Sequence, residues 1–274
     1  MRLLLALPKF GIVLLIAAIF AMLWLVHQNE KEEERAVLIK DVLWLEQNVR
    51  FHLNGTEEQL QQMAAELGTG DERKKTFRLR AGHILKNNTD VAQILWFDKQ
   101  RNVIDAIPAA GPPDGKIESF GPPVTQKAFD NARRMGKRVY SEPFFLSDNA
   151  AHFEIAIPIY VDRAFVGAII AVYSFDSLLA DLVPWWFAEK YQVVIIDDND
   201  VQYAAKSNIQ GIPNISYDLP FEPPGYGLKF RVTSYQTASN PLQRLLAVAI
   251  LLLAGGVLWS LWLVRNLMKQ RAQA

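Results

Sequence analysis

The sequence predicts an α+β protein in which a long helix is followed by two antiparallel sheets, with an apolar segment near each end of the chain. Three observations predict this class. Apolar residues recur at helical spacing over residues 28–67, alternate at strand spacing over residues 152–161, and run without charge over residues 10–26 and 245–264. Because runs of strands are interrupted by single helices, we expect an antiparallel sheet with helices on one side.

Composition narrows the function classes. The 274 residues carry 29 basic and 29 acidic side chains, so the formal net charge is zero. A nucleic-acid-binding domain usually carries a basic stripe, and a neutral balance argues against that class. The chain has no cysteine, which excludes disulfides, thiol catalysis and metal sites with cysteine ligands.

The two apolar segments, 10–26 and 245–264, predict membrane-spanning helices, because a span needs about 20 apolar residues. The short tails outside them, residues 1–9 and 265–274, are basic, so the positive-inside rule places both in the cytoplasm. An alternative for the first segment is a cleaved signal peptide, but no small-x-small cleavage site follows its apolar core. We therefore expect a two-pass protein of a bacterial inner membrane, with residues 28–243 in the periplasm.

The stretch 28–67 predicts a stalk helix with a near-heptad apolar stripe. Two interpretations of the stripe remain open. It packs along its own domain, as one face of an amphipathic helix must, or it pairs with a second copy of the chain. The residues of the stripe are Val42, Leu45, Val49, Leu53, Leu60, Met63 and Leu67.

Residues 68–180 predict a first α+β module. The run Gly68 to Asp71 ends the stalk helix, and Gly136 ends a later one, since glycine favours helix termination. The strand candidates form a hairpin of two strands and, after a helix, three further strands. The expected elements are a helix at 72–86, strands at 94–97 and 103–107, a Gly/Pro-rich loop at 108–123, a helix at 124–135, and strands at 138–146, 152–161 and 165–175.

Residues 181–241 predict a second, smaller module. A helical stretch at 176–190 leads into a hairpin of strands 191–197 and 201–205. A proline-rich loop then leads to a strand at 227–235. A sheet of this size buries little core alone, so we expect it to pack against the first module.

These segments resemble a known family. The runs ILWFD and VIDAIP, then MGKRVYSEPFF, then FEIAIPIYVDRAFVGAIIAVYSFDSLL, resemble extracytoplasmic PAS-like (Cache) sensor domains. The run VVIIDDNDVQYAAKS looks like the second module of a double-Cache sensor. The runs DVLWLEQNVRFHLNGTEEQLQQMA and LVPWWFAEKYQVVIIDD are similar to the input regions of C4-dicarboxylate-sensing histidine kinases of proteobacteria. The resemblance covers residues 35 to 237.

The resemblance implies a membrane-distal module that binds a small organic acid, a membrane-proximal module, and a homodimer. It also implies that the second membrane helix passes a signal to a cytoplasmic kinase. This chain contains no kinase segment, so it departs from the family at that point. We expect the kinase to belong to the rest of a longer chain, with a separate partner protein as the alternative. No nucleic-acid partner is expected.

Candidate ligand contacts lie around residues 137–141, because arginine and lysine bind carboxylates and hydroxyls orient them. On a strand that starts near Arg138, Arg138 and Tyr140 face one side and Ser141 the other. A solvated helix end is the competing interpretation of the cations. The predicted ligand contacts are Lys137, Arg138, Tyr140, Ser141, His152 and Tyr173.

Catalytic patterns are missing from the sequence. Its four histidines are widely spaced, and no metal-binding motif, GxSxG elbow or phosphate-binding glycine loop occurs. Residues 197–200, DDND, loosely resemble a calcium loop but lack its glycine and distant glutamate, so we expect a hairpin turn. We expect no catalytic residue, metal or cofactor. Two other classes stay open: a membrane scaffold without a small ligand, and an extracytoplasmic enzyme.

Overall fold

The computed structural model describes residues 2–69, 72–109, 123–146, 149–207 and 211–235, and isolated positions between 248 and 262. The chain divides into two units, and the unit Ile39–Tyr235 holds every described strand. Within the described residues, no helix is both long and apolar enough to cross a membrane. The side chains of the predicted spans 10–26 and 245–264 lie almost wholly outside the described part of the structure. The two spans therefore stay predictions.

Helix α1 (Arg2–Thr69) is longer than the predicted stalk. Its apolar stripe is buried inside the unit Ile39–Tyr235: Val42, Leu45, Val49, Leu53 and Leu60 are each at most 1% exposed. The interpretation that the stripe packs along its own domain is therefore confirmed. The stripe is not available for pairing with a second copy.

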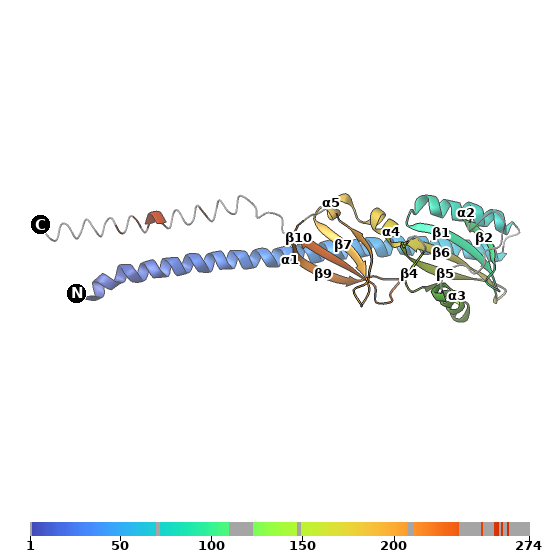
Figure 1. The fold of residues 1–274 in the computed structure, drawn as a ribbon, viewed down its shortest axis with the longest axis horizontal. Helices are drawn as coiled ribbons and strands as arrows, with labels where there is room; N and C mark the ends of the chain where they lie inside the picture. The colour runs from blue at the N-terminus through green and yellow to red at the C-terminus, as the bar shows by residue number, and fades with distance from the viewer. Residues whose placement is uncertain are drawn as a thin grey trace. The chain divides into compact units, whose positions relative to one another are not determined.

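The first sheet has six antiparallel strands in the order β2-β1-β6-β5-β3, with β4 also paired to β5. Figure 1 shows it beside α1, with α2 and α3 nearby. The predicted hairpin, the two helices and the last two strands are present, but the strand predicted at 138–146 is instead two strands of two residues each, β3 and β4. Their bounds are α2 (Arg73–Asn87), β1 (Val91–Asp98), β2 (Val103–Ile107), α3 (Pro123–Met135), β3 (Val139–Tyr140), β4 (Phe144–Phe145), β5 (Ala151–Val161) and β6 (Ala164–Ser174).

Helices cover both faces of the first sheet, so the expectation of helices on one side was wrong. One face packs against α3, where Phe129 contacts Phe97 and Phe165 edge-on. The opposite face packs against α2 through Phe77 and Trp96, and against α1. As a result β5 is buried on both sides, although its sequence alternates between apolar and more polar residues.

Two glycines allow local geometry that other residues would strain. Gly136 has φ +63° and donates its N–H to the carbonyl of Ala132, which ends α3 as predicted. Gly167 lies on β6 against β1, where a Cβ atom would collide with the carbonyl of Phe97. Both positions set how closely α3 and β1 approach their neighbours.

The second sheet has the antiparallel order β8-β7-β10-β9. Its strands are β7 (Tyr191–Ile196), β8 (Gln202–Lys206), β9 (Pro213–Pro220) and β10 (Lys229–Tyr235). The sequence missed β9, because its residues alternate between exposed and half-buried and prolines bound it, which is typical of an edge strand. The helix predicted at 176–190 is instead α4 (Phe175–Leu182) and α5 (Trp185–Ala188), since Pro184 separates them.

The two sheets share one aromatic core. Phe153 of β5 lies 4.9 Å from Phe175 of α4 and 6.1 Å from Phe221, which follows β9 (ring centroid to centroid). Phe221 in turn lies 4.6 Å from Phe230 of β10. All four rings are at most 1% exposed. The second module therefore packs against the first, as its size required.

A lysine adds a polar link between the modules. The ammonium of Lys206, on β8, donates to three carbonyls at the end of α4: Leu179 O at 3.2 Å, Ala180 O at 2.7 Å and Val183 O at 2.7 Å. A cation at a helix C-terminus also opposes the negative end of the helix dipole. Because α4 directly follows β6, this contact ties the end of the first sheet to the second.

Candidate ligand-binding site

Five of the six predicted ligand contacts divide between the two faces of the first sheet. Arg138, Tyr140 and Tyr173 face α1, whereas Ser141 and His152 face α3. The predicted alternation of Arg138 and Tyr140 against Ser141 is confirmed. The sixth residue, Lys137, is exposed just after α3.

The face toward α1 holds a polar group that we name the α1-side cluster: Glu57, Arg138, Tyr140 and Tyr173. The guanidinium of Arg138 forms an ion pair with the carboxylate of Glu57 on α1. Tyr140 donates its hydroxyl to Glu57 Oε2 at 3.0 Å. Burial raises the pKa of Glu57, while Tyr140 and Arg138 lower it. The predicted carboxylate-binding residues thus already bind a carboxylate of the protein itself.

Tyr173 of this cluster and Asp90 beside it are fully buried. Tyr173 is stacked on Phe153 at 4.9 Å, and among the described residues its hydroxyl has no hydrogen-bond partner. Asp90 accepts a hydrogen bond from His52 Nε2 at 2.9 Å, and that bond is the largest of the effects that raise the pKa of His52. The His52–Asp90 bond fastens α1 to the start of β1, and the ring stack joins β6 to β5.

The opposite face holds the α3-side cluster: Arg101, Thr125, Ser141, His152 and Glu154. Ser141 Oγ accepts the N–H of Glu154 at 3.0 Å and donates to the Glu142 carbonyl at 2.8 Å. The ring of His152 donates from Nδ1 to the Ala150 carbonyl at 2.9 Å and stacks on Phe144. The side chains of Ser141 and His152 are therefore fixed by their neighbours.

Arg101 and Glu154 are functional candidates that the sequence did not single out. Arg101 stands in the β1–β2 turn with φ +66°, and its guanidinium donates to Thr125 Oγ1 at 2.8 Å, at the start of α3. Glu154 is 3% exposed. Burial raises the pKa of Glu154 to about 8, and Arg101 is close enough to oppose that rise. The one signal in the sequence was Glu154, a charged residue within a predicted strand of mostly apolar residues.

Chemically, the α3-side cluster suits a small polar ligand. It offers a guanidinium, a carboxyl, hydroxyls and an imidazole at the edge of an apolar surface that includes Leu95, Ile170 and Val172. Such a mixture of apolar lining and few fixed polar groups is typical of small-molecule sites. Among the described residues, no group of histidines and carboxylates could hold a metal ion.

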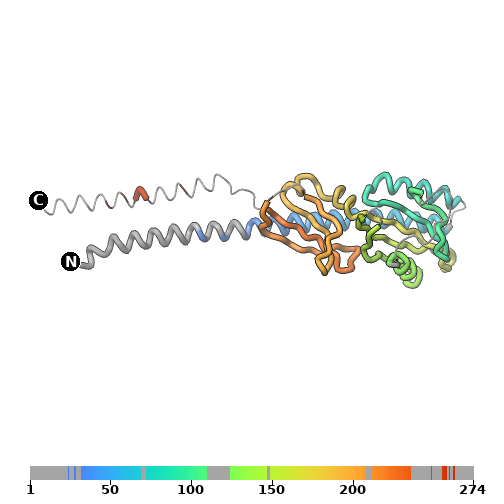
Figure 2. Tube along the Cα trace, in the orientation of Figure 1, coloured from blue at the N-terminus to red at the C-terminus, as the bar shows by residue number. Residues whose placement is uncertain are grey.

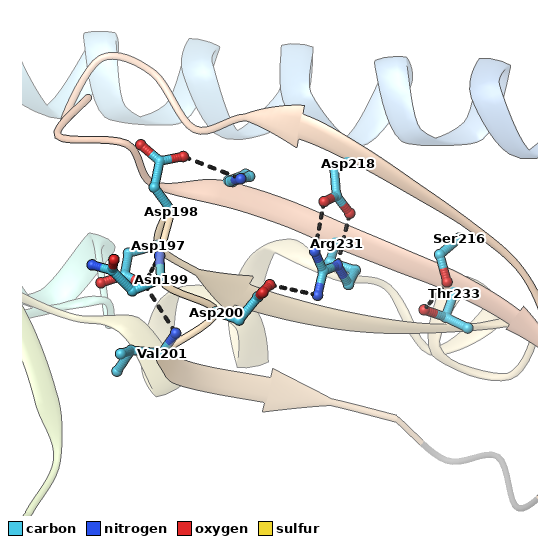
Figure 3. A network of polar contacts seen from close by, with 10 residues as sticks. Asp197, Asp198, Asn199, Asp200, Val201, Ser216, Asp218, Arg231 and Thr233 are labelled. Atoms are coloured by element: carbon cyan, nitrogen blue, oxygen red, sulfur yellow. Dashed lines mark hydrogen bonds and ion pairs between the residues drawn. The ribbon is translucent and has the colours of Figure 1, made fainter.

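The turn at residues 197–200 adopts the predicted hairpin geometry between β7 and β8. Asp197 Oδ1 accepts the backbone N–H groups of Asn199 at 2.8 Å and Val201 at 2.9 Å, as Figure 3 shows. These two bonds lower the pKa of Asp197. The carboxylate therefore shapes the turn, which is a common role of aspartate.

Two cations of the second sheet, Arg231 and Lys229, are paired with carboxylates of the same module. Arg231 binds Asp218 through two hydrogen bonds of 2.8 Å and forms an ion pair with Asp200 at 2.8 Å (Figure 3). Lys229 pairs with Asp198 at 3.1 Å. An acidic ligand would have to displace these carboxylates. The first sheet is therefore the better place for an anion-binding site.

Comparison with known proteins gives independent evidence about the class of protein. No protein-family model matches the chain. It is similar to the C4-dicarboxylate transport sensor protein DctS of Rhodobacter capsulatus, with 26% identity over 230 residues that cover 83% of this chain. Those residues make up 32% of DctS, so the chain spans about a third of the length of that relative.

Solved structures share the fold. The ligand-binding domain of the Pseudomonas fluorescens chemoreceptor CtaA, in complex with L-alanine, superposes with a TM-score of 0.52 at 13% identity, over 74% of this chain and 97% of that domain. The domain of Pseudomonas aeruginosa PctB, in complex with L-Gln, gives 0.50 at 14% identity, over 74% and 94%. This chain has the fold of these ligand-binding domains, as its resemblance to Cache sensor domains predicted.

The tertiary structure decides which predicted residues meet. It brings Arg138 and Tyr140 together on Glu57, and it places Ser141 beside Glu154. It keeps these two groups on opposite faces of one sheet. The ligand roles of the six predicted residues stay predictions.

Proposed function

We propose that the chain is the input region of a transmembrane sensor histidine kinase, and that it binds a small organic acid such as a C4-dicarboxylate. The α3-side cluster is the proposed site. The observation that carries the proposal is Arg101, a guanidinium held by Thr125 on the same face as the buried carboxyl of Glu154. Guanidinium groups bind carboxylates in two-point contacts. The name of DctS supports the ligand class.

The α3-side cluster is favoured over the α1-side cluster because of charge. Arg138 is already neutralised by Glu57, so a second carboxylate there would meet a net charge near zero. We therefore assign Ser141 and His152 to the ligand side. Arg138 and Tyr140 are assigned to holding α1 on the sheet, and Tyr173 packs beneath them.

The same sheet then links ligand and output. Tyr140 of β3 belongs to the α1-side cluster, whereas Ser141, the next residue, and Glu154 of the paired strand β5 belong to the α3-side cluster. A shift of these strands on binding would act on Glu57 and hence on α1. Only the difference in ligand affinity between two states can move such an equilibrium. The two apolar segments would carry the change to a cytoplasmic kinase.

We further propose that a second copy of the chain covers an exposed face of α1. Trp44 and Phe51 stand seven residues apart on α1 and are 42% and 83% exposed. They lie on a different face of α1 from the buried stripe. Side chains repeated every seven residues form a seam that packs against an identical helix. A parallel homodimer would bury them.

The proposal is tested by thermal unfolding of the full chain in detergent with succinate, malate, fumarate, L-alanine and L-glutamine. A ligand at about 100 times its dissociation constant adds about 2.7 kcal/mol of stability. We expect a dicarboxylate to raise the midpoint, Arg101→Met to abolish the rise, and Arg134→Met, an exposed arginine of α3, to leave it unchanged. A rise with the amino acids alone would replace the acid by an amino-acid ligand. No rise with any compound would favour a scaffold.

A further inference from the structure

Glu154 is an unusual residue for its place in the fold. It lies on β5 among apolar residues, is 3% exposed, and its Oε1 atom has no hydrogen-bond partner among the described residues. An isolated buried carboxylate is strongly disfavoured, so such a group keeps its proton. A protonated carboxyl is a hydrogen-bond donor that the described fold leaves unused.

The charged and titratable groups on every element around Glu154 are otherwise engaged. Arg101, from the β1–β2 turn, donates to Thr125 of α3. His152, on the same strand, is bonded to the Ala150 carbonyl. Lys127 of α3 forms an ion pair with Glu142 at 3.8 Å, and the partner of Glu154 on β6 is the apolar Val172. None of these groups forms a described hydrogen bond or ion pair with the Glu154 carboxyl.

We propose that Glu154, in its protonated form, donates a hydrogen bond to a carboxylate of the same acidic ligand that Arg101 binds. This inference rests on the proposed function and names the recognition chemistry of that site. The bond is an O–H···O⁻ contact, which is shorter and stronger than a neutral hydrogen bond. The ligand class is therefore an organic acid with ionised carboxylates, and a ligand ammonium group is not required.

The proposal makes binding depend on pH. Below pH 7 Glu154 keeps its proton, because burial raises its pKa to about 8. Above that pKa the side chain becomes an anion, loses the donated bond and repels the ligand carboxylate. Ordinary carboxylates ionise near pH 4, so the ligand itself does not change charge between pH 7 and 9. The change in affinity over this range then reports the protein group.

The test is the affinity of the full chain for succinate, measured by calorimetry at pH 6.5, 7.5, 8.5 and 9.5. We expect the wild-type affinity to fall about tenfold for each pH unit above 8. Glu154→Gln keeps a donor that does not titrate, so its affinity should stay constant with pH. Glu154→Ala should bind at least tenfold more weakly at pH 6.5. Glu142→Gln, a change at an exposed carboxylate, should follow the wild type.

Each contrary result is distinct. If succinate binds with the same affinity at every pH and Glu154→Ala binds like the wild type, the inference fails while the proposed function stands. If Glu154→Gln abolishes binding and L-alanine binds the wild type, Glu154 acts as the counter-ion of an ammonium group, which overturns the inference. If no dicarboxylate binds the wild-type chain, the proposed function and the inference both fall.

Discussion

Replacing Glu154 by glutamine should change how the stability of the ligand-free protein depends on pH. In the unfolded chain this carboxyl has its ordinary pKa of 4.5, and burial in the folded protein raises the pKa to about 8. Between these two values the unfolded state has lost the proton and the folded state still holds it. The unfolded state therefore binds fewer protons, and the free energy of unfolding falls as pH rises.

The size of the effect follows from that window. Each pH unit inside it costs about 1.36 kcal/mol, so the two units from pH 5 to pH 7 cost about 3 kcal/mol. All of this stability is present below pH 4.5, and its loss is complete once the pH passes the folded pKa of about 8. Glutamine cannot ionise, so Glu154→Gln should lack this part of the pH dependence.

The assay is urea unfolding followed by tryptophan fluorescence, for the wild type, Glu154→Gln and the exposed-site control Glu142→Gln. The other titrating groups are common to all three proteins and cancel in the difference. We expect the wild type and Glu142→Gln to lose about 3 kcal/mol more than Glu154→Gln between pH 5 and pH 7. Equal losses within about 0.5 kcal/mol would refute a protonated, buried Glu154.

Three further changes test the rest of the structure. Phe153→Ala removes one ring from the aromatic core shared by both sheets and should cost about 3–5 kcal/mol of unfolding free energy. The midpoint of a single thermal transition should then fall by roughly 6 to 20 °C. Two separate transitions would contradict a shared core. Lys206→Met should destabilise the protein by about 1–2 kcal/mol in urea unfolding, since three carbonyls of α4 lose a charged donor, and an unchanged midpoint would argue against the link. Phe51→Ser should weaken self-association in sedimentation measurements while Leu79→Ser, at an exposed leucine of α2, does not; equal effects would argue against the α1 face.

Much of the local structure could be predicted from the sequence. The seven-residue spacing on α1, the alternation on β5 and the turn at Asp197 each reflect the geometry of a few neighbouring residues. Gly136 ended α3 as predicted, because a left-handed residue suits glycine. The edge strand β9 was missed, because one exposed face and bounding prolines resemble a loop.

The candidate site was harder to predict, because its properties depend on residues far apart in the chain. The sequence marked Arg138 and Tyr140 as carboxylate-binding residues, and they do bind one, but it belongs to Glu57, 83 residues before Tyr140. The sequence singled out Ser141 and His152 but not their neighbour Arg101. In the sequence Arg101 looks like part of a solvated turn, and only the fold brings Thr125 beside it.

By itself, the sequence determined the α+β class, the apolar stripe of α1, the positions of most strands and the resemblance to Cache sensors. Those features follow from periodicity and local backbone preference, which act over a few residues. Only the tertiary structure decided that helices cover both faces of the first sheet and which charges are already neutralised. A charge or a buried carboxyl takes its character from the groups packed around it, and the fold brings those groups together from distant parts of the chain.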